Sequence, residues 1–314
     1  MYALSCSIRF YTQQGCVEFD SASAVSIRRD ADQLCHTCSI TLPRRVNWVR
    51  LDGIPIGRGD RVEVQLGYDG HNLPAYVGYV RQVHLGPPTT VECLCPVSLL
   101  QQQPAQRLSY ASATLNQLLA DQGVQAIIGG EQHIGAYRVQ ADTVAQLLDD
   151  LRQQGFRFVG RLDAQGQHRL YAGLLISPSD APTFAFEEGC NIISRADLRV
   201  ADPDTLRFCV RVQAVGHSAQ QPPVELGDAD GELRTFSVVG MDAAQMRSYG
   251  EQQLQRLREG RIGGAFTTFG GHTVQPMDHL QITLDGSPTV QAVAQKVEID
   301  WDSNGFRQKI EVRM

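Results

Sequence analysis

The sequence predicts a mainly β fold of the α+β class, in which two similar small antiparallel β-barrels flank an inserted α+β domain. Apolar and polar residues alternate with period two across residues 259–314, and a similar order of patterns occurs across residues 57–95. Helical patterns stand between these two regions. We therefore expect a first barrel at residues 1–99, an α+β insert at 100–180 and a second barrel at 181–314.

The closing stretch reads as a run of short strands. Leu280, Ile282 and Leu284 alternate with polar residues, and Ile310 and Val312 alternate with charged ones. Turn-forming sequences at 270–271, 285–286 and 302–305 separate the runs. Short strands with one apolar face must curl into a barrel or pack on a partner. One helix, at about 242–258, is expected ahead of this stretch, with Asp242 as its cap.

The first part of the chain repeats this pattern. Gly59 and Asp60 precede an alternating run at 62–66, as Met277 and Asp278 precede the run at 280–284. Residues 80–83 then correspond to 293–297, and 91–93 to 310–312. Upstream, the segments around Ile27 and at 38–41 resemble those around Leu198 and at 209–212. The alternative is that any two antiparallel β segments look alike at this level.

The middle part changes character near residue 100. Residues 114–122 and 143–154 each place leucines on one helical face and are followed by a glycine at which the helix ends. Residues 156–162 and 168–175 read as a hairpin. This segment is therefore the expected α+β insert.

Bulk composition excludes several classes of function. The chain has 314 residues, a net charge of −6 and no basic cluster, which argues against a sequence-reading nucleic-acid binder. It has no apolar run long enough to span a bilayer, and we expect no secretion signal. Its eight cysteines are expected to be free thiols. A metal held by Cys35, Cys38, Cys93 and Cys95 is the less favoured interpretation, so we predict no metal and no cofactor.

No catalytic motif emerges, and we predict that the chain is not an enzyme with catalytic residues. The acidic turn at 228–232 lacks the spacing of a calcium loop. Asp278 and His279 are adjacent and would face opposite sides of a strand, so they do not form an acid–base set with His272. Glu187 and Glu188 are neighbours rather than two carboxylates facing each other across a cleft.

Two segments carry a family resemblance. The sequence RIGG at 261–264, followed by FTTFG at 266–270 and by Val274, Pro276 and Asp278, resembles the closing barrel of the bacteriophage tail baseplate hub family. The segment 224–236 ahead of a helix does so too. These are the late-control-type hub proteins, related to the hub part of type VI secretion spike proteins. Met277 departs from the glycine usual before the aspartate, so we expect the turn at 276–278 to differ from its counterpart in the first barrel.

The resemblance implies a structural role without catalysis. Such hubs are homotrimers, whose three subunits present a ring of six barrels joining the tail tube protein to the spike protein, alongside other baseplate proteins. DNA or a tape-measure protein would pass through the channel without sequence-specific binding. The protein would be located in the virion tail baseplate, after assembly in the host bacterial cytoplasm. The candidate interface residues are Asp60, Phe266, Thr267, Phe269 and Asp278.

Two other functions stay open at this point. A hydrolase acting on cell-wall glycan would need a cleft with paired carboxylates. A carbohydrate-binding β module would need exposed aromatic residues, and only 7% of the residues are aromatic.

Overall fold

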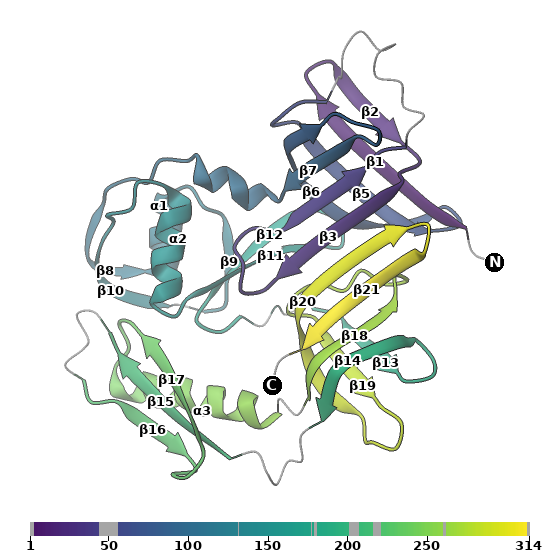
Figure 1. Ribbon diagram of the computed structural model, residues 1–314. Coiled ribbons are helices and arrows are strands. Elements are labelled where there is room, and N and C mark those ends of the chain that lie inside the picture. The colour runs from purple at the N-terminus through teal and green to yellow at the C-terminus, as the bar shows by residue number, and fades with distance from the viewer. Residues whose placement is uncertain are drawn as a thin grey trace.

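Two β-sheet modules of related topology are joined edge to edge, and a mixed α/β body lies beside them (Figure 1). The computed structural model describes residues 3–43, 56–130, 132–176, 178, 181–200, 207–215, 221–259 and 262–312. Strands predominate over helices among these residues, which confirms the mainly β, α+β fold class.

Module 1 comprises the first seven strands. They are β1 (Leu4–Thr12), β2 (Gly15–Phe19), β3 (Ala24–Asp30), β4 (Thr37–Thr41), β5 (Arg61–Tyr68), β6 (His71–His84) and β7 (Thr90–Leu94). Their order in the sheet is β2-β1-β5-β6-β7-β4-β3, and every neighbouring pair is antiparallel. The alternating burial of β1 and β5 brings Ile8, Phe10, Val62 and Val64 into the core.

Module 2 comes from the second half of the chain. Its strands are β13 (Thr183–Glu187), β14 (Ile192–Val200), β18 (Ile262–Phe269), β19 (His279–Thr283), β20 (Val290–Asp302) and β21 (Gly305–Val312). Their order is β13-β19-β20-β21-β18-β14, which matches β1-β5-β6-β7-β4-β3 position by position. One difference is that β13 is parallel to β19, whereas β1 is antiparallel to β5.

The two modules form one continuous sheet because β3 pairs with β20. The described strands follow an open hydrogen-bonded path that ends at β2 and at β14, and no pair among them closes a barrel. The repeated topology is therefore observed, whereas closure of each module into a barrel stays a prediction. Buried apolar residues of both modules form a single core cluster.

The body beside the modules contains all three α-helices of the described residues (Figure 1). Its first part comprises η2 (Pro96–Gln101), β8 (Ser109–Thr114), α1 (Leu115–Asp121), β9 (Ala126–Ile128), β10 (His133–Arg138), α2 (Val144–Gln153), β11 (Arg157–Leu162) and β12 (His168–Gly173). Helix α2 begins with a capping box, in which the Thr143 hydroxyl accepts from the Gln146 N–H while the Gln146 side chain accepts from the Thr143 N–H.

The second part of this body interrupts module 2 between β14 and β18. It contains β15 (Phe208–Ala214), β16 (Val224–Gly227), β17 (Glu232–Val238) and α3 (Ala243–Glu259), the helix expected at about 242–258. Val210, Val212 and Met246 share a core cluster with leucines of α1 and α2. Core packing thus groups the described residues of this second part with the middle of the chain, from which they are separated in the sequence.

One predicted correspondence is wrong. The segment at 209–212 was expected to repeat the strand at 38–41, but β15 pairs with β16 and β17 in a separate three-stranded sheet. Strand β18 holds the place beside β21 that β4 holds beside β7. The alternation of Cys209, Val210, Arg211 and Val212 predicts a half-buried strand correctly, but it carries no information on which core receives the apolar face.

Candidate functional site

The repeat is clearest in two turns of identical construction. The Gly57 N–H donates to Asp60 Oδ2 at 2.7 Å, and the Asp60 N–H donates to the Gly57 carbonyl at 3.2 Å. In module 2, the Gln275 N–H donates to Asp278 Oδ2 at 2.7 Å, and the Asp278 N–H donates to the Gln275 carbonyl at 3.1 Å. In each turn the aspartate carboxylate therefore holds the backbone three residues before it.

Each turn is hydrogen-bonded in the same way to the second strand that follows it, which is β6 in module 1 and β20 in module 2. Gly59 N–H and Asp60 carbonyl bond to Val80, and Met277 N–H and Asp278 carbonyl bond to Ala294, at 2.7–3.0 Å. A β-bulge follows directly in both cases, between Val80 and Gln82 and between Ala294 and Lys296. The turns, the bulges and the strand order agree residue by residue, which indicates that the two modules are structural repeats.

Met277 does not change the turn, contrary to expectation. It adopts a positive φ of 72°, in the left-handed region where Gly59 has a φ of 93°. This backbone strain is offset because the Met277 side chain is buried in a small cluster with Ala31, Val159, Tyr171 and Ile176. The methionine thus joins β11, β12 and the loop after β3 to module 2.

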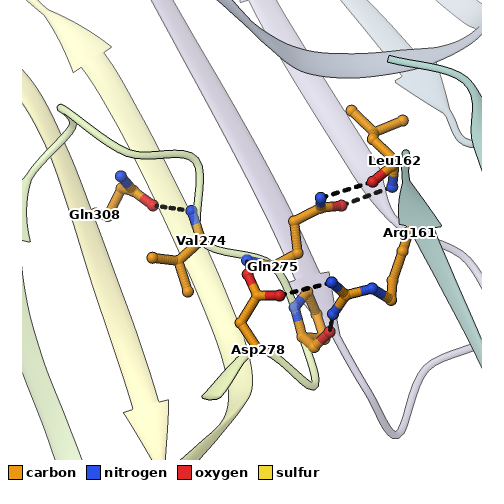
Figure 2. A network of polar contacts seen from close by, with 7 residues as sticks. Arg161, Leu162, Val274, Gln275, Asp278 and Gln308 are labelled. Carbon is orange, nitrogen blue, oxygen red and sulfur yellow. Dashed lines mark hydrogen bonds and ion pairs between the residues drawn. The ribbon is translucent and has the colours of Figure 1, made fainter. Parts of the chain in front are cut away.

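The twin turns differ in what binds their aspartates. Asp278 is buried, and its Oδ1 lies 2.6 Å from Nη2 of the equally buried Arg161 on β11 (Figure 2). Arg161 also donates to the Pro276 carbonyl. The Gln275 side chain completes the contact, bonding both the N–H and the carbonyl of Leu162 at 2.6 and 2.9 Å. Burial raises the pKa of Asp278, and the Arg161 charge counteracts this effect. Asp60 is half-buried and forms no ion pair among the described residues.

A second buried cation faces the same junction. Arg29 occupies an inward position of β3, where it donates to the Ala75 carbonyl, and burial lowers its pKa to about 10. Arg29, His36 and His168 line a cavity of about 10 Å³. Arg29 Nη1, His36 Nε2 and His168 Nε2 have no hydrogen-bond partner among the described residues. The body therefore meets both modules through buried polar groups.

The pairing of β3 with β20 carries paired opposite charges on its outer face. The register places Lys296 between Asp30 and Glu311, and Glu298 between Arg28 and Lys309. Asp300 lies next to Arg307 in the following row. Opposite charges therefore face each other across the strands, which stabilises the register and leaves this face without net charge.

Several strand edges remain uncovered among the described residues, including those of β2 and β13, and two of them correspond by the repeat to the paired edges of β3 and β20. Strand β14 ends the sheet and pairs only with β18, and residues 82–84 of β6 pair only with β7 because β5 stops opposite Tyr79 and the turn at Gly59 and Asp60 bonds Val80. Exposed apolar side chains accompany both edges, namely Ile193 and Val200 on β14 and Leu85 directly after β6. Such edges favour pairing with another chain.

The candidate interface residues fall into different environments. Asp278 contacts the body within the same chain, and Phe266 is in the core, where its ring centroid lies 5.0 Å from that of Phe186. Phe269 is 55% exposed on β18, and Thr267 lies opposite Ser194 of β14. A role of these residues between subunits stays a prediction.

Three of the carboxylates considered for catalysis or metal binding form ion pairs or hydrogen bonds within the chain. Glu188 binds Arg195 at 3.2 Å and the Asp285 N–H at 3.1 Å, and Asp228 and Asp230 pair with Arg258 and Arg207. No group of three His, Cys, Asp or Glu side chains in the described part of the chain is arranged to hold a metal ion. A cleft of about 690 Å³ beside α3 has no Asp or Glu among its described lining residues. None of the described helices is long and apolar enough to cross a membrane.

Sequence reasoning missed Arg29, Arg161 and Gln275. A signal for Arg29 exists, because Val25 and Ile27 place residue 29 on the dry face of the strand, where a charged side chain needs a buried partner. Arg161 likewise stands in a run of buried residues in β11. Which acceptors these cations meet depends on tertiary packing, and the sequence pattern does not show it.

The chain shares its fold with known tail proteins. A tail protein from Neisseria meningitidis MC58 is 16% identical, with a TM-score of 0.66 over 100% of this chain and 97% of its own. A 43 kDa tail protein of prophage MuSo2 from Shewanella oneidensis is also 16% identical, with a TM-score of 0.61 over 98% and 96%.

A third similar structure belongs to a secretion machine. The E. coli c3393 protein, a component of the type VI secretion system, is 9% identical, with a TM-score of 0.57 over 93% of this chain and 73% of its own. It is itself similar in structure to the T4 phage tail proteins gp27 and gp5. The sequence matches no protein-family model and no curated protein, so the similarity lies in the fold.

Proposed function

We propose that this chain is a structural, non-enzymatic subunit of the baseplate hub of a phage or prophage tail, or of a related contractile injection machine. Three copies would form a pseudo-sixfold ring that joins the tail tube to the spike. The observation that carries the proposal is the duplicated module, with its twin turns, twin bulges and matching strand order. The shared fold with tail proteins and with a type VI secretion component supports the same role.

The duplication suggests how the ring closes. Within the chain, module 1 joins module 2 through β3 and β20. By the repeat, β14 takes the place of β3, and β6 takes the place of β20. The same pairing between copies would set β14 of one copy against residues 82–84 of β6 in the next. Three such head-to-tail contacts would give six equivalent steps and leave no open end.

The residues at these edges are suited to such a contact. Asp60 lies next to the uncovered part of β6, because its carbonyl accepts from the N–H of Val80, which directly precedes that part. Phe269 and Thr267 lie on β18, the neighbour of β14. Pairing would cover two edges that otherwise favour aggregation. These residues are therefore the proposed subunit contacts, together with Ile193 and Leu85, which are exposed in the single chain.

Partners and location follow from the same proposal. The ring would bind the tail tube protein, the spike protein and other baseplate proteins, and it would reside in the virion tail baseplate after assembly in the host bacterial cytoplasm. DNA or a tape-measure protein would pass through it without sequence-specific binding. The balanced charges of the β3–β20–β21 face and the net charge of −6 suit a surface to which a polyanion does not adhere.

The oligomeric state tests the ring directly. We expect sedimentation at increasing concentration to show a species of three 34.6 kDa chains, and a chain that stays monomeric at the highest concentration would contradict the proposal. Val83 corresponds by the repeat to Val297, which pairs with β3. The backbone of Val297 faces β3, as does the carbonyl of Gln295 two residues earlier, which accepts from the Ala31 N–H. Val83→Pro removes the corresponding N–H from the uncovered edge of β6.

The matched control is Val83→Thr, which keeps the β-branched shape and the N–H. We expect the proline variant to lose the trimer while its circular dichroism and melting temperature stay close to those of the threonine variant. Equal trimer formation by both variants would exclude this edge as the subunit contact.

A further inference from the structure

Two cysteines meet where the pairing of β4 with β7 ends. Cys35 lies just before β4, and Cys95 follows β7 directly, with its N–H donating to the His36 carbonyl at 3.0 Å. The two Sγ atoms are 3.6 Å apart, and both thiols are free. A disulfide needs an Sγ–Sγ distance of about 2 Å, which small side-chain rotations can supply from such a contact.

The two thiols differ in access and in acidity. Cys35 is partly exposed, whereas Cys95 is buried. The side-chain hydrogen bond with Cys35 lowers the pKa of Cys95, and His168 acts in the same direction, although burial opposes them. The same hydrogen bond raises the pKa of Cys35. Small oxidants therefore reach Cys35, and Cys95 is the better thiolate for the second step.

We propose that Cys35 and Cys95 form an oxidation site that closes to an intramolecular disulfide when the protein meets a low-molecular-weight disulfide. The Cys35 thiolate attacks one sulfur of the small disulfide, and one small thiol leaves. The Cys95 thiolate then attacks Cys35 Sγ and expels the second small thiol. The two protein thiols are oxidised, the small disulfide is reduced, and two protons pass to the two departing thiolates.

A neighbouring pair provides an internal contrast. Cys38 and Cys93 are directly opposite in the β4–β7 register, but both are buried. Burial raises the pKa of Cys38 well above its usual value and raises that of Cys93 to about 12. Because neither thiol of this pair is accessible, the pair stays reduced. Cys16 and Cys190 are exposed and form no contact with another thiol among the described residues, so they can only carry mixed disulfides.

The disulfide would link two strand ends of module 1 beside its junction with the body. It would tie the start of β4 to the end of β7, beside the cavity lined by Arg29, His36, Cys95 and His168 at the junction with the body. It would also close a loop from residue 35 to residue 95. Closing a loop of this length restricts the unfolded chain, so we expect the melting temperature to rise by on the order of 5 °C.

The experiment treats the full chain with oxidised glutathione, blocks the remaining thiols under denaturing conditions and maps the peptides by mass spectrometry. In the wild type we expect a peptide linked through Cys35 and Cys95, with glutathione on Cys16 and Cys190. In Cys95→Ser, glutathione should persist on Cys35 because no thiolate displaces it. In Cys35→Ser, Cys95 should stay reduced. Cys93→Ser is the matched control and should retain the link.

The wild-type peptide map decides the matter even if a variant fails to fold. The proposal is overturned if Cys35 stays reduced while Cys16 and Cys190 react, if Cys35 keeps its glutathione in the presence of Cys95, or if the link joins Cys38 to Cys93. A rise in melting temperature that persists in Cys35→Ser would equally contradict it.

Discussion

The buried ion pair between Arg161 and Asp278 offers a direct test of how the body is held to module 2 (Figure 2). Arg161→Met keeps an unbranched apolar chain of similar length and removes the charge. Asp278 would then remain buried, with the Gln275 N–H as its hydrogen-bond donor at 2.7 Å. The Pro276 carbonyl would also lose the donor that Arg161 supplies.

Removal of one partner from a buried pair leaves an uncompensated charge, which costs about 3–5 kcal/mol. We expect a loss of this size in the free energy of unfolding, measured at pH 7.5 by urea denaturation with fluorescence detection. The matched control is Arg169→Met on the same hairpin. Arg169 is half exposed and pairs with Asp163 at 3.0 Å, so its removal should cost at most about 1 kcal/mol.

Two further measurements separate an unpaired charge from lost packing. Burial raises the pKa of Asp278, and removal of Arg161 should raise it further. A carboxyl group with a raised pKa in the folded state binds its proton more tightly there than in the unfolded state. The loss in free energy of unfolding caused by Arg161→Met should therefore shrink as pH falls from 7.5 towards 5. Asp278→Asn in the same background should recover most of the loss. Equal costs for the Arg161 and Arg169 variants at pH 7.5 would refute the reasoning.

Other variants probe the remaining features of the junction. Burial lowers the pKa of His36 to about 4, so folding stability should fall by about 3 kcal/mol as pH drops from 6.5 to 4, and His36→Asn should flatten this dependence in urea titrations. Met277→Gly should destabilise by about 1–3 kcal/mol, because lost burial exceeds the relieved backbone strain, as thermal unfolding can show. Glu298→Lys places like charges beside Arg28 and Lys309, and its cost of about 1 kcal/mol should diminish with added salt.

The features that the sequence predicted well are local. The turn before 62–66 and the turn before 280–284 could be matched because an aspartate that bonds the backbone three residues earlier needs only four consecutive residues. The strands that follow alternate strictly, and their meander order requires only short connections. The mainly β class and the two helical segments of the middle part follow from the same local patterns.

The errors come from non-local packing. The strand at 209–212 resembles that at 38–41, yet its apolar residues belong to the core cluster that contains α1 and α2, because a long insertion interrupts module 2 between β14 and β18. The twin aspartates, Asp60 and Asp278, look alike in sequence and differ because Arg161, 117 residues before Asp278, reaches only one of them. A pattern with period two shows which face of a strand is dry, but it does not show which partner lies there.

The asymmetry between the twin turns bears on how a ring could assemble. The β3–β20 junction is formed within one chain, so its formation does not depend on protein concentration. Beside it, Arg161 and Gln275 hold the turn before β19 to the body, and Met277 packs with Ala31 after β3. The proposed β14–β6 junction lacks these contacts in the single chain, because Asp60 forms no ion pair among the described residues. A contact that depends on edge pairing alone is weak in dilute solution. The proposed ring would therefore close reversibly in isolation and become permanent when a tube or spike partner holds three copies together.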